Sequence, residues 1–220
     1  MVKNLIDGFS DFKKNFFGTD RSFYEQLAKR GQRPKTIIIS CSDSRVDPAI
    51  LFGTRPGDLF VIRNVANLVP PYQPDDNYHG ISAAIEFGIR DLGVKEIVVL
   101  GHAFCGGIKA LCSHVRGEEK DDREFITPWI KIALPVMDQF DSKLEDKDVH
   151  KVEKASIVNS IKNLRTFPWV RSLELANELK IHGWWFDMEH GALWAYDNKK
   201  KKFFPIKTSC LLYTSDAADE

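Results

Sequence analysis

The chain has 220 residues, of which 43% are hydrophobic and 28% are charged, enough to bury a sizeable core. Its 31 basic and 31 acidic residues give a formal net charge of zero, which argues against nucleic acid as a partner. No apolar run reaches the roughly 18 residues of a membrane span, and the first residues lack the apolar core of a secretory signal. The four cysteines are too few for a disulfide scaffold, so we expect a reducing, cytoplasmic compartment and no membrane partner.

The first part of the chain alternates helical and strand patterns. Residues 3–30 carry apolar side chains at helical spacing and predict a helical arm, which either reaches a partner subunit or packs on its own core. Apolar, β-branched runs predict strands over 36–40, 58–63 and 96–100. Residues 80–92 predict a helix that ends at Gly93. This alternation is typical of an α/β fold with a central, mostly parallel β-sheet flanked by helices.

The second part reads as helices followed by a hairpin. Residues 123–180 have a helical pattern, interrupted by Pro128, Pro135 and Pro168. Residues 184–188 and 192–196 predict two strands joined by a tight turn, which adds a C-terminal antiparallel edge strand to the sheet. The charge run Lys199–Lys202 predicts a solvated turn.

The end of the chain differs from what precedes it. We expect one domain over residues 1–209, in which 1–30 form the arm. Residues Cys210–Glu220 do not continue the earlier pattern and resemble the translation of a transposase-type sequencing adapter. An ordinary polar tail is the alternative, but the whole string fits the adapter in one reading frame, which favours a non-native tail.

Two clusters of metal-binding side chains follow two of the predicted strands. Cys41 comes directly after 36–40, and His102 and Cys105 come just after 96–100. Ligands bind at the carboxyl ends of strands in parallel sheets, so the two clusters can meet. Two thiolates and one imidazole form a zinc ligand set that leaves one position open for chemistry.

Each of these residues has a simpler interpretation when taken alone. A cysteine that ends a buried strand, or a lone histidine, is more often a structural residue than a ligand. Their occurrence at two strand ends favours the metal site. Cys112 follows Cys105 by two helical turns and is expected to be a core residue, since it lies too far along the helix to reach the same ion.

Asp43 and Arg45 lie just beyond Cys41. They could form a local ion pair that only closes the loop. Alternatively, Arg45 keeps the Asp43 carboxylate ionised and oriented, so that it accepts a hydrogen bond from water or hydroxide at the metal. The neighbouring zinc ligands favour the second interpretation.

The two motifs, CSDSR at 41–45 and HxxCGG at 102–107, resemble those of β-class carbonic anhydrases. The resemblance covers roughly residues 20–205 and includes the segments RPGDLFVIRNVANLVPP, HGISAAIEFGIRDLGVKEIVVLGH and HGWWFD. It implies reversible hydration of carbon dioxide to bicarbonate with one zinc ion per chain. The implied zinc ligands are Cys41, His102 and Cys105, and the implied catalytic pair is Asp43 and Arg45.

The chain is similar to the plant-like subtype of that family. The resemblance implies a substrate pocket formed by Gln32, Phe60, Val65 and Phe87. Phe87 stands where the subtype has tyrosine, so this pocket lacks a hydroxyl group. Ile38 stands where the other subtype has the tryptophan of an inhibitory bicarbonate pocket, so that regulation is not expected. The family completes its pocket across a subunit boundary, which implies a dimer or a higher even oligomer.

Two other functions are open. The same fold and zinc site occur in hydrolases of carbon disulfide or carbonyl sulfide, which differ in access to the pocket. A non-catalytic, zinc-stabilised protein is the second alternative, and it would require a fourth protein ligand. Asp43 could serve as that ligand.

Overall fold

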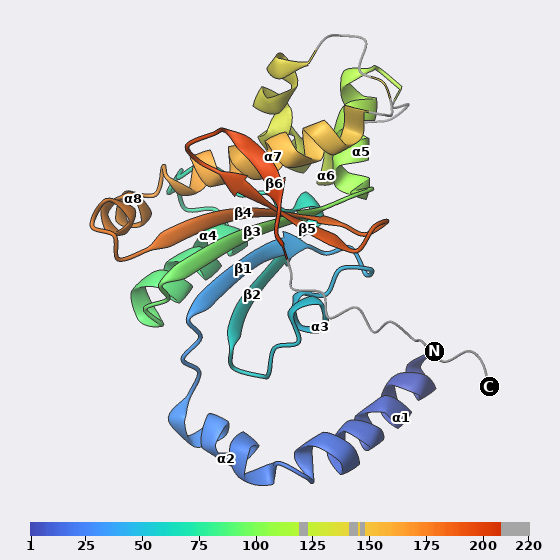
Figure 1. The fold of residues 1–220 in the computed structure, drawn as a ribbon, viewed down its shortest axis with the longest axis vertical. Coiled ribbons are helices and arrows are strands. Elements are labelled where there is room, and N and C mark those ends of the chain that lie inside the picture. Colours follow the sequence, from blue (N-terminus) through green and yellow to red (C-terminus); the bar gives the residue numbers. More distant parts are fainter. Residues whose placement is uncertain (119–122, 141–144, 146–147, 208–220) are drawn as a thin grey trace, which may run out of the picture.

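The computed structural model describes residues 1–118, 123–140, 145 and 148–207. Its centre is a six-stranded sheet with the order β2-β1-β3-β4-β5-β6 (Figure 1). The first four strands in that order run parallel, and β5 and β6 are antiparallel to their neighbours. The strands are β1 (Thr36–Cys41), β2 (Leu59–Asn64), β3 (Glu96–His102), β4 (Lys180–Asp187), β5 (Ala192–Asp197) and β6 (Lys202–Pro205).

Helices connect the strands and cover the sheet. The α-helices are α1 (Val2–Phe12), α2 (Arg21–Arg30), α3 (Pro48–Phe52), α4 (Gly80–Glu86), α5 (Gly106–Val115), α6 (Ile126–Ile130), α7 (Val149–Leu164) and α8 (Pro168–Leu175). The described residues also form tighter or wider helical segments: η1 (Lys13–Phe17), η3 (Phe87–Asp91) and η4 (Lys131–Gln139) each continue an α-helix, and η2 (Val65–Asn67) follows β2. The α/β fold expected from the sequence is confirmed.

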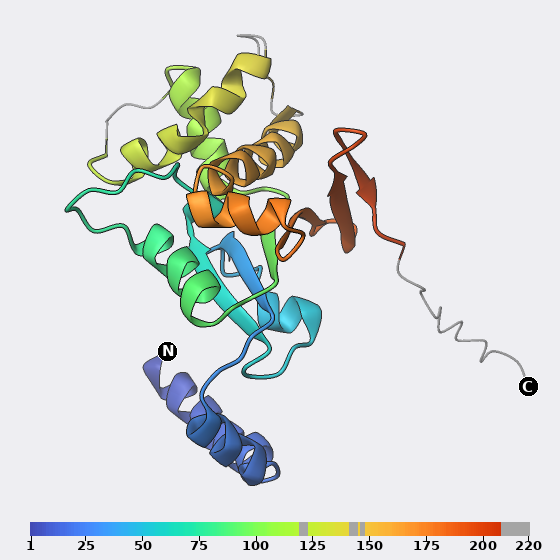
Figure 2. The same cartoon turned by 90° about the vertical axis from the view of Figure 1, so that its left-hand side faces the viewer.

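The two faces of the sheet are covered differently. In β1, Ile37 and Ile39 belong to a large buried cluster that includes side chains of α4, α7 and α8. Ile38 points to the opposite face and packs in a smaller cluster with residues of α3. Figure 2 shows α4, α7 and α8 on one side of the sheet and α3 on the other. Alternate residues of β1 are therefore buried on opposite faces, as its continuous apolar run requires.

A third cluster of buried side chains lies beyond the carboxyl ends of the strands. It joins Cys41 and Cys105 to apolar residues of α5, α6, η4 and α7. Cys112 is fully buried in this cluster, which confirms its prediction as a core residue. These helices form an apolar wall behind the two predicted motifs.

The N-terminal helices form an arm that extends away from the sheet (Figures 1 and 2). Arg55 joins the arm to the rest of the chain, since it pairs with Asp20 and its guanidinium lies 4.0 Å from the centre of the Phe23 ring. No residue of α1 is buried. Among the described residues, α1 therefore does not pack on the core of its own chain, which was one of the two alternatives.

Several element boundaries differ from the prediction. The helical pattern was predicted to reach residue 180, but α8 ends at Leu175 and β4 already begins at Lys180. Pro128 and Pro135 do not break helices: the first lies in the opening turn of α6, where proline is tolerated, and the second lies inside η4. Pro168 begins α8, at the position that proline favours.

The C-terminal hairpin has one strand more than predicted. The run Lys199–Lys202 is a turn only in part, because Lys202 begins β6. Two antiparallel strands therefore follow β4, and β6 is the edge strand. The predicted non-native tail lies outside the described residues. Within the described ranges, no helix combines the length and the apolar character needed to cross a bilayer.

Candidate metal centre

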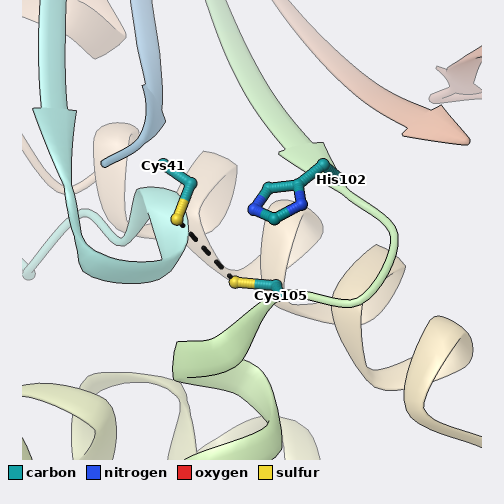
Figure 3. A group of neighbouring side chains, drawn as sticks. All are labelled: Cys41, His102 and Cys105. Atoms are coloured by element: carbon teal, nitrogen blue, oxygen red, sulfur yellow. Dashed lines mark hydrogen bonds between the residues drawn. The ribbon is translucent and has the colours of Figure 1, made fainter. Parts of the chain in front are cut away.

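The sheet places the three predicted metal ligands together. Cys41 ends β1 and His102 ends β3, and these two parallel strands are neighbours at the point where the strand order reverses. Cys105 directly precedes α5. One ligand atom from each of the three lies within 4.8 Å of the other two, and the two sulfur atoms are 3.9 Å apart (Figure 3).

The orientation of His102 suits a metal ligand. Its Nδ1 lies 2.8 Å from the carbonyl oxygen of Ala103, so we assign the ring proton to Nδ1. Nε2 is then an acceptor; it is buried and has no hydrogen-bond partner among the described residues. An unsatisfied buried acceptor is costly. A cation between Nε2 and the two sulfur atoms would satisfy it.

The contact between the two sulfur atoms makes Cys41 the more acidic thiol of the pair and Cys105 the one that keeps its proton. The hydrogen bond from Cys105 lowers the pKa of Cys41 to about 4. The same contact, together with burial, raises the pKa of Cys105. The backbone N–H of Ala66 also donates to Cys41 Sγ, at 3.3 Å. Because a metal binds thiolates, binding at this site would release that remaining proton.

A strained turn brings Cys105 toward the other two ligands. Phe104 has a positive φ of 58°, which is uncommon for a residue with a side chain. Arg45 Nη2 donates to the carbonyl oxygen of Phe104, at 3.1 Å. A Cβ atom at Gly107 would lie 2.7 Å from Val65 Cγ1, so this position has no room for a side chain. The HxxCGG motif therefore combines a left-handed residue before Cys105 with a glycine after it that packs closely against Val65.

Asp43 and Arg45 form a two-pronged ion pair beside the centre. Arg45 Nε and Nη2 donate to Asp43 Oδ1 and Oδ2, at 2.9 and 2.7 Å. Asp43 Oδ2 lies 3.9 Å from His102 Nε2. The Arg45 guanidinium holds the pKa of Asp43 well below its usual range. The carboxylate is therefore charged at any pH at which the protein is used.

Sequence reasoning missed Arg63 on β2, which organises the loop after Cys41. Its guanidinium donates to the carbonyl oxygens of Cys41, Asp43 and Val46, at 3.0, 2.8 and 2.8 Å. It also donates to a carboxylate oxygen of Asp47, at 3.1 Å. An arginine inside the otherwise apolar run of β2 was a signal that could have identified it.

We expect Arg63→Lys to destabilise this loop. Lysine offers one nitrogen in place of a planar fork that donates through Nε, Nη1 and Nη2, so a single nitrogen does not reach every group that Arg63 holds, and at least one of them loses its partner. The free energy of unfolding should fall by about 1–3 kcal/mol, as measured by chemical denaturation. Unchanged stability would show that water replaces the lost donors without cost.

The predicted substrate residues are only partly brought together. The rings of Phe60 and Phe87 are neighbours, with centres 6.1 Å apart. Val65 and Phe87 are 38% and 45% exposed, so both apolar side chains are open to solvent. Gln32 lies exposed in the segment between α2 and β1, and its side chain makes no hydrogen bond within the described part of the chain.

Comparisons with known proteins agree with the geometry. A family model described as carbonic anhydrase matches residues 36–193. A carbonic anhydrase of Synechocystis sp. is 37% identical over 201 residues, which cover 89% of this chain and 71% of the relative. Beta carbonic anhydrase 3 of Arabidopsis thaliana is 35% identical over 212 residues, covering 93% of this chain and 81% of the relative.

Solved structures show the same fold. The structure of the β-carbonic anhydrase CcaA matches with a TM-score of 0.84 and 34% identity, over 94% of this chain and 93% of that one. A structure described among two tetrameric β-carbonic anhydrases of Sordaria macrospora matches with a TM-score of 0.75 and 26% identity. That match covers 88% of this chain and 95% of the other.

Proposed function

Since the chain belongs to the β-carbonic anhydrase family, an enzyme family, we propose that it catalyses the reversible hydration of carbon dioxide to bicarbonate and a proton. We propose one zinc ion per chain, bound by Cys41, His102 and Cys105. The observation that carries the proposal is the convergence of two sulfur atoms and the buried Nε2 of His102, which has no hydrogen-bond partner in the part of the chain that the structure describes. Two thiolates and one imidazole are a ligand set of catalytic zinc.

The side chains around this centre have separate roles. A zinc ion held there would lower the pKa of water and supply hydroxide near neutral pH. Asp43 is charged and acceptor-only, so it orients the attacking oxygen by accepting its hydrogen bond. A carboxylate with so low a pKa is a poor base, so Asp43 does not keep the proton, which leaves to buffer. Arg45 keeps the carboxylate in place.

Carbon dioxide is apolar and needs an apolar surface beside the centre. Val65 is well placed for this, because its neighbour Ala66 donates to Cys41 Sγ and Val65 itself lies against Gly107. We propose that Phe60 and Phe87 extend this surface and that Gln32 hydrogen-bonds a substrate oxygen. The absence of a hydroxyl group at Phe87 makes the pocket more apolar than one with tyrosine there.

An assay of three substrates tests the proposed reaction. We expect zinc-loaded protein to hydrate carbon dioxide and to leave carbon disulfide and carbonyl sulfide unchanged at the same enzyme concentration. Hydrolysis of either sulfur compound without hydration of carbon dioxide would establish the related hydrolase. Inactivity toward all three, with zinc fully bound, would favour a structural metal site closed by Asp43.

Hydration should be faster at alkaline pH. Two thiolates would cancel the two positive charges of a zinc ion, whereas three neutral imidazoles would not. Water held by zinc at this centre would therefore have a pKa above the value of about 7 that a three-histidine site gives. Because the pKa of Asp43 is well below this range, its titration does not contribute to the pH dependence of turnover here. Turnover per zinc should therefore rise from about pH 6 and still be rising at about pH 8. A maximum below neutrality would contradict this charge argument.

The exposed arm favours self-association. On α1, Leu5, Ile6 and Phe9 are 71%, 61% and 63% exposed, so the helix presents apolar side chains that its own chain leaves uncovered. We propose that a second copy of the chain covers them in a dimer or a higher even oligomer. Sedimentation of the full chain tests this, and a monomer at micromolar concentration would contradict it. We also propose a cytoplasmic location, because a reducing compartment suits two thiolate ligands.

A further inference from the structure

Glu153 on α7 is a buried carboxyl group with no part in the mechanism described above. It is 2% exposed, and it is the one carboxyl group that is buried in the described part of the chain. Burying such a group is costly unless hydrogen bonds compensate. Its Oε1 accepts from the backbone N–H of Cys105, at 3.0 Å. Its Oε2 accepts from Trp185 Nε1, at 3.1 Å, and lies 2.9 Å from His150 Nδ1.

These contacts tie Glu153 to the strained turn of the metal centre. Arg45 holds the carbonyl oxygen of Phe104, and Glu153 holds the next N–H, that of Cys105. Arg45 and Glu153 therefore both hydrogen-bond the peptide unit that joins Phe104, which is left-handed, to Cys105, which is a proposed metal ligand. The ring of His150 packs edge-on against Phe104, with centres 4.9 Å apart, and so supports the same turn.

The partners of Glu153 are themselves held in place. Trp185 is 3% exposed in the core of the sheet, where its ring centre lies 5.4 Å from that of His150. The Trp185 ring also contacts Lys154, whose Nζ lies 3.9 Å from the ring centre. The carboxyl group thus has a defined position, set by β4 and α7 together, from which it can fix Cys105.

We propose that Glu153 is a positioning residue that holds the Cys105 turn in its metal-binding conformation. The inference rests on the proposed zinc site. Without the bond from Cys105 N–H to Oε1, Arg45 alone holds this peptide unit by a hydrogen bond, and we expect Phe104 to leave its left-handed conformation more often and to carry Sγ of Cys105 away from Cys41 and His102. Loss of a group that orients a metal ligand typically weakens metal binding about 10- to 100-fold.

Zinc release from Glu153→Gln tests the proposal. The amide has one acceptor oxygen, so its nitrogen faces the N–H of either Cys105 or Trp185, and one of these two hydrogen bonds is lost whichever way the amide lies. Full-length, zinc-loaded protein is mixed with excess chelator, and the half-time of zinc release is recorded. We expect release at least about 10-fold faster than from the parent. The thiolate-to-metal absorption of the cobalt(II) form should also change.

Glu174→Gln is the matched control. Glu174 accepts two hydrogen bonds from Arg165 through its two oxygen atoms and is remote from the turn, so its loss should leave zinc release unchanged. A purely structural role for Glu153 would lower the melting temperatures of the zinc-loaded and metal-free forms equally. The proposal requires a larger loss in the zinc-loaded form.

His150→Ala keeps the test decisive if Glu153→Gln does not fold. The side chain of His150 is 37% exposed, so its removal is tolerated, and because it contacts both Glu153 Oε2 and the Phe104 ring, its loss should accelerate zinc release by more than about two-fold but less than Glu153→Gln does. Release within about two-fold of the parent from whichever variant folds overturns the inference while the zinc site stands. A parent chain that binds no zinc overturns the proposed function as well, which separates the two failures.

Discussion

Replacement of Cys41 by serine should release most of the zinc while the chain remains folded. The serine hydroxyl does not ionise at working pH, so the site loses one of its two anionic ligands. It also exchanges the thiolate sulfur that now accepts from Ala66 N–H and the Cys105 thiol for a neutral and smaller oxygen. We expect less than about a tenth of the parent's zinc after dialysis, measured as zinc per chain, since outer contacts alone already change affinity by that factor.

Cys112→Ala provides the control for this experiment. Cys112 is equally buried and lies seven residues beyond Cys105 on α5, but it is not one of the three clustered ligands. Its replacement should reduce stability modestly and leave one zinc per chain. If Cys41→Ser also retained a full complement of zinc, Cys41 would not be a ligand and the assignment of the site would be wrong.

Replacement of Asp43 by asparagine should have the second largest effect, and on turnover alone. The side chain keeps its shape, but it loses its charge and one of the two oxygen atoms that Arg45 now contacts. The amide nitrogen that replaces that oxygen is a donor, and it faces an N–H donor of Arg45. The contact between residue 43 and Arg45 therefore opens, and the remaining oxygen of residue 43 is no longer oriented toward the metal centre. Hydration should fall by about 100-fold, the usual effect of misplacing a reacting group, with zinc content unchanged.

The pair Arg165–Glu174 offers a control with the same geometry. Arg165 Nε and Nη2 contact the two oxygen atoms of Glu174 at 2.8 and 2.7 Å, as Arg45 contacts Asp43. Glu174→Gln should therefore change stability only, and hydration should be normal. If Asp43→Asn hydrated carbon dioxide within a few-fold of the parent, the Asp43–Arg45 pair would merely close the loop.

The parallel half of the fold was predictable where its strands are buried on both faces, as β1 and β3 are. Such strands appear in the sequence as continuous apolar runs, and β1 and β3 were predicted nearly to the residue. The start of β4 was missed because Lys180, His182 and Gly183 interrupt its apolar run. β6 was missed because a strand of four residues after a lysine run has too little pattern to stand out. Its pairing with β5 decides its conformation.

The candidate site was predictable where the side chains themselves carry the chemistry and stand close together in the sequence. The cysteines, the histidine and the Asp43–Arg45 pair stand in two short motifs at strand ends. Arg63 and Glu153 were not predicted because they act on backbone groups that the fold alone brings near. Glu153 is 48 residues from the N–H that it holds, and nothing in its local sequence distinguishes it from the exposed charges of a helix.

Zinc-dependent hydration of carbon dioxide is the most direct test of the proposed function. Metal-free protein is titrated with zinc, and initial hydration rates are measured by stopped flow with metal analysis of the same samples. We predict a rate that rises in proportion to zinc and stops rising at one zinc per chain. Zinc bound at one per chain without a rise in hydration, or hydration independent of zinc, would contradict the assignment of Cys41, His102 and Cys105 as the catalytic metal centre.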